Sequence, residues 1–524
     1  MLASGPGRAA LEPADRHTQP APAMQTEFLT PEGPPRDDAA RQGARRLHVR
    51  LGGEVCTKSP RTRRHFLAAL TRNARAALRR EGVPGEVVQE WTRLVVSTPE
   101  PKAAREVLAR VFGVHRVHEV VEVPFGSLPE LVDALAARYR PAVAGRSFAV
   151  RPKRRAQVGF GSQDLSVALG AALLPSAARV DLDDPDVEVI VELHQGHADA
   201  VLASSPGAGG LPLGTGGHAV GLFSGGFDSP VAAWRVMRRG TRLDLMICDL
   251  GGCGQLDQAL AVAQRLATRW TPGMEPRFWV VDLAPVVLAL TQRANPRLRQ
   301  ILLRRAMYRA GSALAQELGA SALVTGESLG QVSTQTLGNI RACDQAAGVP
   351  VLRPLIGMGK DEILATARAI GTYEVSAKVQ EHCSISPGRV ETWASPDRIS
   401  AAEREIDAEP LTPEWIRRAV AARRQVDLLR WRPGGLPDLV VDSVPPGAVV
   451  VDVREPEEGP TVGDRRLPFS RAAELLDQLD PAGRYLLVCA RGQRSYTLAR
   501  ELARRGVTAW SLAGGVATLR SNAA

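Results

Sequence analysis

The 524-residue sequence has few cysteines, few lysines and few aromatic residues, and it contains no long apolar run. Six scattered cysteines exclude the disulfide framework of a small secreted domain and indicate a reducing compartment. No stretch reaches the roughly 18 apolar residues of a membrane span, and the N-terminus has no apolar signal segment. We therefore expect a cytoplasmic protein that has no membrane partner.

The shortage of lysine leaves the positive charge to arginine. Of 66 basic residues only five are lysine, and the formal net charge is +10. The planar guanidinium suits phosphate and base recognition, so the composition admits a nucleic-acid partner, although a codon bias toward arginine gives the same excess. The length predicts three or four domains, and a 44% hydrophobic composition supplies apolar residues for several cores.

The order of apolar and polar segments predicts an α/β multidomain chain. Proline, glycine and charged residues dominate the N-terminus, which predicts a disordered tail. A small α+β unit and a compact α/β module follow. In the longer segment after them, the strands AVGLFS, LDLMICDL, FWVVDL and SALVTGE alternate with helices, as in a doubly wound parallel sheet. A polar connector leads to a last small α/β unit. The predicted bounds are 1–46, 47–104, 105–204, 205–386, 387–436 and 437–524.

The turn SGGFDS follows an apolar strand and precedes the helix-like segment VAAWRVMRR. Gly225 and Gly226 let the backbone approach a phosphate closely, and the hydroxyls of Ser224 and Ser229 can donate to its oxygens. The N-terminus of the helix adds unpaired N–H groups and the positive end of a dipole. This pyrophosphate cradle resembles the PP-loop, SGGxDS, of the ATP pyrophosphatases, in which Asp228 would position a metal ion or pyrophosphate.

Two other phosphate-binding patterns are absent or misplaced. No run matches the Walker A loop GxxxxGK[ST], because Lys360 is followed by Asp361. A loose GxGxxA match at residues 214–219 precedes a strand, whereas a dinucleotide-binding fold requires it after one. The sequence therefore disfavours a P-loop enzyme that cleaves a γ-phosphate.

A second reactive segment lies near the C-terminus. Cys489 ends the apolar run YLLV, and the loop ARGQ that follows it opens a helix. Backbone N–H groups of such a loop, the helix N-terminus, Arg491 and Arg494 all favour a nucleophilic thiolate. Together with the runs VDVREP and LAGG, this segment resembles rhodanese, whose cysteine carries a persulfide.

The remaining candidate ligands and thiols are weaker. Cys383 lies in the polar segment QEHCSISP, where a second thiol could release sulfur and close a disulfide. Cys248 and Cys253 have no second pair at zinc-ligand spacing, and His194 and His197 have no third ligand nearby in the sequence. We therefore predict no metal site built from protein side chains.

The order of these parts resembles the tRNA 4-thiouridine synthetase family, ThiI, in its long form with a rhodanese domain. The resemblance implies a ferredoxin-like unit at 47–104, a THUMP RNA-binding domain at 105–204, a PP-loop domain at 205–386 and a rhodanese domain at 437–524. The basic run that it assigns to RNA binding comprises Arg151, Lys153, Arg154 and Arg155.

The resemblance also assigns individual residues. The stretch TGESLGQVSTQT is similar to a family motif that lines the nucleotide pocket, which makes Gly326 and Gln335 expected ATP contacts. Leu222 and Phe223 are expected to pack against adenine, and Arg304 takes the position of a basic residue near the phosphates. Cys489 aligns with the persulfide cysteine and Cys383 with the thiol that forms a redox disulfide with it.

The activity that the resemblance implies is ATP-dependent transfer of persulfide sulfur to uridine at position eight of tRNA. It implies ATP with Mg²⁺ and no permanently bound cofactor. A cysteine desulfurase would donate sulfur and an external reductant would open the disulfide. Sulfur transfer to a carrier protein for thiamin thiazole synthesis, either additionally or instead, remains open, as does a homodimer. A protein that only binds RNA is disfavoured by the intact SGGFDSP and CARGQRS segments.

Overall fold

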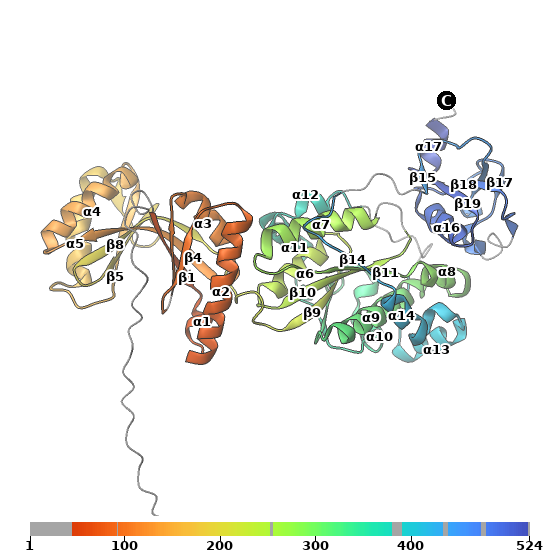
Figure 1. Cartoon of the computed structure of the whole chain (residues 1–524), viewed down its shortest axis with the longest axis horizontal. Helices are drawn as coiled ribbons and strands as arrows, with labels where there is room; N and C mark the ends of the chain where they lie inside the picture. The colour runs from red at the N-terminus through yellow and green to blue at the C-terminus, as the bar shows by residue number, and fades with distance from the viewer. Residues whose placement is uncertain are drawn as a thin grey trace, which may run out of the picture. The chain divides into compact units, whose positions relative to one another are not determined.

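The computed structural model describes residues 45–91, 93–251, 255–379, 390–432, 439–472 and 478–521 (Figure 1). The predicted disordered tail therefore lies outside the described residues, except for its last two positions, which already belong to a strand. Cys253 and Cys383 also lie outside them.

Eight strands form a mixed sheet in the order β2-β3-β1-β4-β8-β7-β5-β6. They are β1 (Arg45–Leu51), β2 (Glu86–Gln89), β3 (Arg93–Thr98), β4 (Val114–Pro124), β5 (Ser147–Arg154), β6 (Arg179–Val180), β7 (Val187–Leu193) and β8 (His197–Pro206). Because the long strand β4 pairs with both β1 and β8, the predicted α+β unit and α/β module share one continuous sheet. The predicted boundary after residue 104 is wrong, since it cuts through helix α3 (Pro101–Ala109).

Among the described residues, helices pack on one face of this sheet only, and we call the other face the open face. They are α1 (Gly53–Cys56), α2 (Pro60–Arg80), α3, α4 (Leu128–Val143) and α5 (Ser162–Leu173), followed by the 3₁₀ turn η2 (Leu174–Ser176). Side chains alternate along a strand, so Val49 of β1 and Val191 of β7 lie in the two cores beneath the helices. Their neighbours Arg50 and Glu192 point to the open face, where they form an ion pair.

The second sheet carries the predicted nucleotide-binding turn. Its order is β13-β12-β9-β10-β11-β14. The strands are β9 (His218–Leu222), β10 (Arg242–Asp249), β11 (Phe278–Asp282), β12 (Leu323–Val324), β13 (Val351–Leu352) and β14 (Arg424–Val426). The first five are parallel, which confirms the doubly wound prediction, and β14 joins antiparallel to β11. β10 and β12 lie on opposite sides of β9, and the chain runs from β9 to β10. The SGGFDS turn, which follows β9, therefore lies at the topological switch point, where the strand order reverses.

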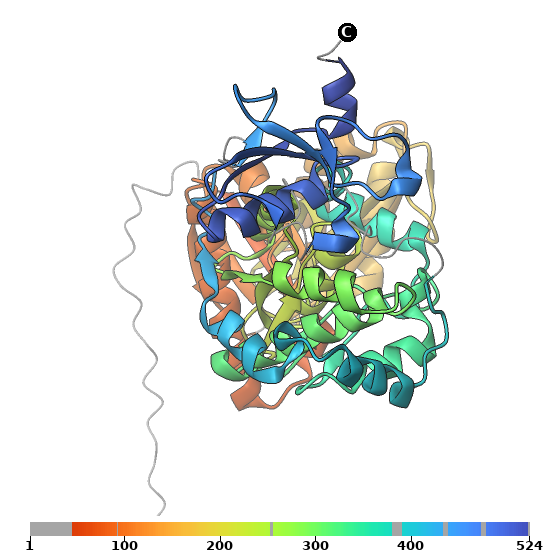
Figure 2. The same cartoon turned by 90° about the vertical axis from the view of Figure 1, so that its right-hand side faces the viewer.

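Helices pack on both faces of this sheet (Figures 1 and 2). One face carries α6 (Asp228–Met237), α7 (Gln255–Trp270), α11 (Lys360–Ile370) and α12 (Tyr373–Ser376). The other carries α8 (Ala284–Arg293), α9 (Arg299–Leu318), α10 (Leu337–Asp344), α13 (Pro396–Ile406) and α14 (Pro413–Ala421). The short turns η3 (Ser333–Gln335) and η4 (Glu409–Leu411) complete the unit.

The predicted connector at 387–436 is largely part of this nucleotide unit. Ile399 of α13 and both Ile416 and Val420 of α14 are buried in the core with α8 and α9, and β14 extends the sheet. Charged residues dominate the exposed faces of these helices, so the segment has the composition of a linker although its few apolar residues lie at helical spacing.

The C-terminal unit is a five-stranded parallel sheet in the order β15-β19-β18-β16-β17. Its elements are β15 (Val440–Val441), β16 (Val449–Asp452), η5 (Pro456–Glu458), β17 (Arg465–Arg466), η6 (Phe469–Arg471), β18 (Arg484–Val488), α16 (Gln493–Arg504), β19 (Thr508–Leu512) and α17 (Val516–Ser521). Cys489 follows the central strand β18, as the sequence predicted. Within the described ranges no helix combines the length and apolarity that crossing a membrane requires.

Candidate functional site

The turn between β9 and α6 has the shape of a phosphate cradle. The N–H groups of Ser224 and Gly225 donate to Ser229 Oγ at 3.2 and 3.3 Å, which closes the turn around one hydroxyl. Gly225 has φ of 82°, and a Cβ there would lie 2.7 Å from Ala259 Cα, so only glycine fits. A Cβ on Gly226 would meet only Ser224 Oγ, at 3.7 Å. The open space over Gly226 is therefore where a phosphate can approach the backbone.

Asp228, the first residue of α6, joins three segments that are distant in sequence. Gln331 Nε2 donates to Asp228 Oδ2 at 2.9 Å, and Lys360 Nζ donates to Oδ1 at 2.9 Å. Lys360 is the first residue of α11, and its ammonium group also lies 5.5 Å from the centre of the Phe227 ring. The carboxylate thus holds a cation beside the cradle. The sequence prediction missed Lys360, because 132 residues separate it from Asp228. Gln331 lies in the TGESLGQVSTQT stretch that was assigned to the nucleotide pocket, but it was given no contact of its own.

The predicted nucleotide contacts Gly326 and Gln335 belong to the loop that faces this turn. A Cβ on Gly326 would lie 2.9 Å from Ser229 N, so glycine is required for the loop to pack against the start of α6. Gln335 is buried, and its Oε1 accepts from Ser328 N at 3.3 Å, which braces the loop from within.

Arg304 is directed toward a buried carboxylate. Its guanidinium donates to Glu327 Oε1 at 2.8 Å, and Arg353 Nε and Tyr308 Oη donate to Glu327 Oε2 at 2.7 and 2.5 Å. Burial raises the pKa of Glu327, but the two arginines and the tyrosine hydroxyl outweigh it and hold this pKa below its ordinary value. Burial and the anionic neighbour raise the pKa of Tyr308. This ionised network anchors the loop that carries Gly326.

Leu222 ends β9, and Phe223 follows it directly before the cradle. Phe223 is buried against Phe278, with ring centroids 6.1 Å apart and an interplanar angle of 79°. Leu222 is half-buried, and its Cδ2 would lie 3.1 Å from a Cβ on Gly311. Both residues therefore form the apolar floor behind the turn.

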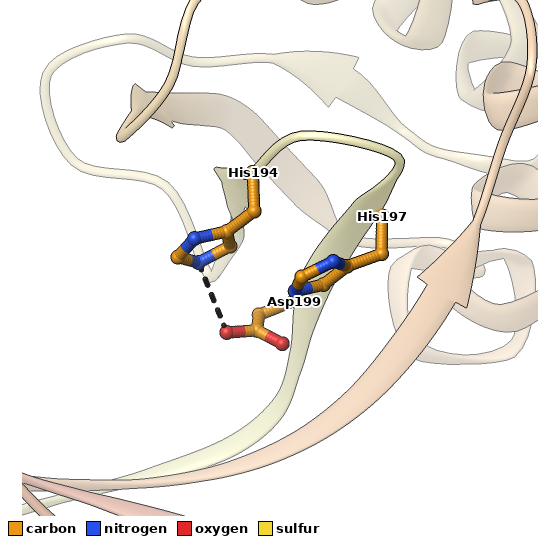
Figure 3. A group of neighbouring side chains, drawn as sticks. All are labelled: His194, His197 and Asp199. Atoms are coloured by element: carbon orange, nitrogen blue, oxygen red, sulfur yellow. Dashed lines mark ion pairs between the residues drawn. The ribbon is translucent and has the colours of Figure 1, made fainter. Parts of the chain in front are cut away.

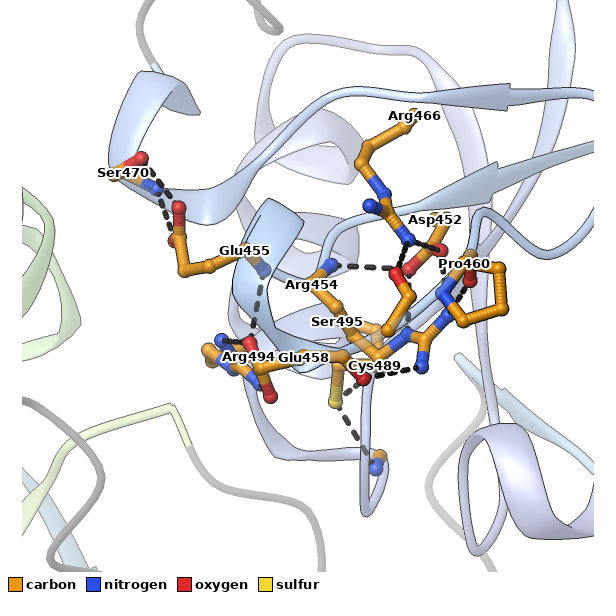
Figure 4. Close-up of polar contacts among 12 residues, drawn as sticks. Asp452, Arg454, Glu455, Glu458, Pro460, Arg466, Ser470, Cys489, Arg494 and Ser495 are labelled. Carbon is orange, nitrogen blue, oxygen red and sulfur yellow. Dashed lines mark hydrogen bonds and ion pairs between the residues drawn. The ribbon is translucent and has the colours of Figure 1, made fainter. Parts of the chain in front are cut away.

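The loop after β18 surrounds the sulfur of Cys489 (Figure 4). The Gly492 N–H donates to Sγ at 3.1 Å, and the Ser495 hydroxyl donates to it at 3.3 Å. Ser511 Oγ lies 2.8 Å from Ser495 Oγ and donates to Gly492 O at 3.1 Å, so it holds both donors in place. Gly492 has φ of 84°, which lets the loop turn back toward the sulfur. These donors stabilise negative charge on Sγ.

Ion pairs connect the segments that surround this loop to one another. Arg494 donates to both oxygens of Glu458, at 2.7 and 2.6 Å. Asp452, at the end of β16, accepts from Arg454 and Arg466. Burial raises the pKa of Asp452, but these hydrogen bonds prevail and lower it to about 2. The loop is therefore held by charged groups that stay ionised at neutral pH. Arg491 is exposed.

The open face of the eight-stranded sheet contains a basic hollow of about 430 Å³. Three of the four predicted RNA-binding residues, Arg151, Lys153 and Arg155, line it, and Arg154 is exposed next to them. The sequence prediction missed the contributions of β1 and β4, which add Arg50, His115, Arg116 and His118. Burial first and then nearby arginines lower the pKa of His118 to about 4.

Beside this hollow, the β7–β8 hairpin brings His194, His197 and Asp199 together (Figure 3). The sequence prediction that no third ligand accompanies the two histidines is wrong. Side chains of alternate residues share a face of a strand, so β8 places Asp199 beneath the turn. Burial lowers the pKa of His194 and outweighs the opposite effect of Asp199.

Three family models match successive parts of the chain. The model described as thiamine biosynthesis protein (ThiI) covers residues 214–408, a THUMP domain model covers 125–199, and a ThiI ferredoxin-like domain model covers 46–117. The fold and the site thus define a PP-loop-type ATP-binding unit joined to a THUMP domain and a ferredoxin-like domain.

Individual relatives identify the family within this class. A tRNA sulfurtransferase of Desulfurococcus amylolyticus is 37% identical over 480 residues, which cover 90% of this chain and 98% of the relative. A tRNA sulfurtransferase of Pectobacterium atrosepticum is 32% identical over 474 residues, covering 87% and 97%. The crystal structure of a 4-thiouridine synthetase in complex with RNA and ATP is 28% identical, with a TM-score of 0.63, and covers 73% of this chain and 99% of that one. The chain belongs to the ThiI family of tRNA sulfurtransferases.

Proposed function

We propose that this enzyme converts uridine at position eight of tRNA to 4-thiouridine, using ATP to activate the base and a persulfide to supply sulfur. The observation that carries the proposal is the Asp228–Lys360–Gln331 constellation beside an open phosphate cradle, in a chain whose relatives are tRNA sulfurtransferases. The similar structure named a 4-thiouridine synthetase, with RNA and ATP bound, supports the choice of product.

Activation is the first step. The C4 oxygen of uracil is a poor leaving group and must first be activated. It attacks the α-phosphorus of ATP, and pyrophosphate departs. The N–H groups at the start of α6 and the Lys360 ammonium stabilise the charge that develops on pyrophosphate. The proposed ATP contacts are Leu222, Phe223, Ser224, Gly225, Gly226, Asp228, Ser229, Arg304, Gly326 and Gln335.

Asp228 also fits a Mg²⁺ ion that accompanies ATP. Its carboxylate is one-quarter exposed, and each oxygen receives only one of the two donors, which leaves a lone pair on each oxygen for a cation. Such an ion would neutralise phosphate charge, while Lys360 keeps the carboxylate oriented toward the cradle.

Sulfur delivery is the second step, and we assign it to a rhodanese domain at the C-terminus. A cysteine desulfurase loads Cys489 with a persulfide, whose terminal sulfur attacks C4 and displaces AMP. The Cys383 thiolate then attacks Cys489 Sγ, breaks the S–S bond and releases 4-thiouridine. A Cys383–Cys489 disulfide remains, and an external two-electron reductant opens it, which favours a cytoplasmic setting. Support for this step comes from the donors around Cys489 Sγ.

We assign tRNA binding to the open basic face of the eight-stranded sheet. Point charges such as Arg151, Lys153, Arg154 and Arg155 attract phosphates without reading sequence, and aligned positive charge in a hollow suits a folded RNA backbone.

Replacing Lys153 with alanine is expected to weaken tRNA binding roughly threefold to tenfold, because one phosphate contact is lost. The slope of the logarithm of the binding constant against the logarithm of salt concentration should become about one unit less steep. Filter binding over a range of salt concentrations measures both quantities. Lys102→Ala is the matched control, since Lys102 is an exposed lysine on α3, which packs against the covered face. Equal losses in the two variants would place the RNA elsewhere.

A second function, sulfur transfer to a carrier protein for thiamin thiazole synthesis, is favoured by the description of the matching family model. This reaction needs Cys489 but does not need the tRNA base to be activated. It can accompany tRNA thiolation or replace it.

The test of the proposed function is a reconstituted reaction with tRNA, ATP, cysteine, a cysteine desulfurase and a reductant. We expect the near-ultraviolet absorbance of 4-thiouridine to appear in tRNA, to require ATP, and to vanish when uridine eight is replaced by cytidine. Sulfur transfer to a carrier protein without any thiolated tRNA would leave only the second function.

A further inference from the structure

The turn between β7 and β8 arranges three potential metal ligands. Gly196 has φ of 77°, and the His194 N–H donates to His197 O at 2.9 Å, which closes the hairpin. The imidazole rings of His194 and His197 are stacked, with centroids 4.9 Å apart and planes 8° apart. Figure 3 shows the Asp199 carboxylate next to both rings. One ligand atom from each residue lies within 4.8 Å of the other two.

An independent observation indicates that this cluster binds a cation. Asp199 is 2% exposed, yet its Oδ1 has no hydrogen-bond partner among the described residues. Asp199 Oδ2 lies 3.2 Å from His194 Nε2 but 3.7 Å from both His48 Nδ1 and Arg93. Leaving a buried carboxylate oxygen without a partner is costly, and a bound cation removes that cost.

The available ligands restrict the kind of cation. Arg93 already binds Glu90 and His48, and Arg50 and Arg155 bind Glu192, so the neighbouring carboxylates are already paired with arginines. A hard cation such as Ca²⁺ requires several oxygen ligands, which this environment does not provide. Two imidazoles and one carboxylate instead match the ligand preference of Zn²⁺ and similar ions, and the half-buried histidines leave room for water as a fourth ligand.

We propose that His194, His197 and Asp199 form a binding site for a divalent transition-metal ion. The 3.2 Å between His194 Nε2 and Asp199 Oδ2 suits two ligands of one tetrahedral ion whose metal–ligand bonds are about 2.1 Å. Rotation of the His197 side chain brings its nitrogen to the same ion. The metal clamps the β7–β8 hairpin, from which Glu192 holds Arg50 and Arg155 in the basic face.

The experiment is a titration of the full-length protein with Co²⁺, followed by visible absorbance after prior removal of metals. Co²⁺ bound by nitrogen and oxygen ligands gives weak d–d bands, whereas thiolate ligation adds an intense near-ultraviolet band, so binding at cysteines is recognised. We expect about one equivalent with nitrogen and oxygen character, and at least about tenfold weaker binding in His197→Ala and Asp199→Asn. His65→Ala, an exposed histidine on α2, is the matched control.

Circular dichroism identifies any variant that fails to fold, and His197→Ala decides the outcome if Asp199→Asn unfolds. Zn²⁺ should also raise the unfolding temperature of the wild-type protein and of His65→Ala more than that of His197→Ala, because the metal binds only the folded hairpin. Equal Co²⁺ affinity in the wild-type and His197→Ala proteins, or a spectrum with thiolate ligation alone, would overturn the proposal.

Discussion

Replacing Cys489 with serine is expected to reduce tRNA thiolation by at least about 10⁴-fold while base activation continues, since the variant loses the nucleophile but keeps the ATP site. Serine cannot carry a persulfide. The Gly492 N–H and Ser495 hydroxyl that now donate to Sγ can donate to a serine oxygen instead, so the loop should keep its shape. Thiolation is followed by the near-ultraviolet absorbance of tRNA, and activation by tRNA-dependent release of pyrophosphate.

Inorganic sulfide separates the two steps. If Cys489 only delivers sulfur, sulfide added at high concentration should attack the activated base and restore thiolation in Cys489→Ser. Cys56→Ser is the control, because Cys56 is a half-buried thiol in the short helix α1 and has no proposed role. Thiolation by Cys489→Ser at the wild-type rate with cysteine and desulfurase alone would exclude the persulfide role.

The parts of the site that sequence reasoning located are those built from neighbouring residues. The cradle from Ser224 to Ser229 and the loop after Cys489 each lie between one strand and the next helix, so their shape follows from a short segment. Sequence order was sufficient to predict both.

The parts that it missed depend on long-range packing. Lys360 had been excluded as a Walker lysine, and only the position of α11 beside α6 brings it to Asp228. Asp199 is separated from His197 by one residue, yet its role became visible only when β8 was assigned and its side chain was placed on the open face.

The same reasoning explains the errors in domain organisation. β4 looked like one strand of one unit, but its 11 residues are long enough to pair with β1 over one half and with β8 along most of its length. Charge density made residues 387–436 resemble a linker, although Ile416 and Val420 are buried on the face of α14 that packs against the core. The composition of residues 387–436 therefore indicated correctly that most of their side chains are exposed, but it did not reveal that their few apolar side chains pack in the core.

Cys383 lies outside the described residues, so its pairing with Cys489 stays a prediction from the family resemblance.

Replacing Asp228 with asparagine is expected to produce the opposite pattern to Cys489→Ser. Base activation should fall about 100- to 1,000-fold, because asparagine keeps the size of the side chain but removes the charge that holds Lys360 beside the cradle. tRNA-dependent release of pyrophosphate measures this loss. Sulfide should not restore thiolation, whereas loading of Cys489 with persulfide by the desulfurase should be unchanged.

The matched control is Asp361→Asn, which removes an exposed carboxylate from the residue after Lys360 and should leave pyrophosphate release within about twofold of wild type, as expected for surface changes. Unchanged pyrophosphate release in Asp228→Asn would remove Asp228 from activation. If Asp228→Asn abolished tRNA thiolation but still supplied sulfur to a carrier protein, the two functions would separate at this residue. Activation by ATP at this site would then be required only for tRNA thiolation, whereas Cys489 would deliver sulfur to both tRNA and the carrier protein.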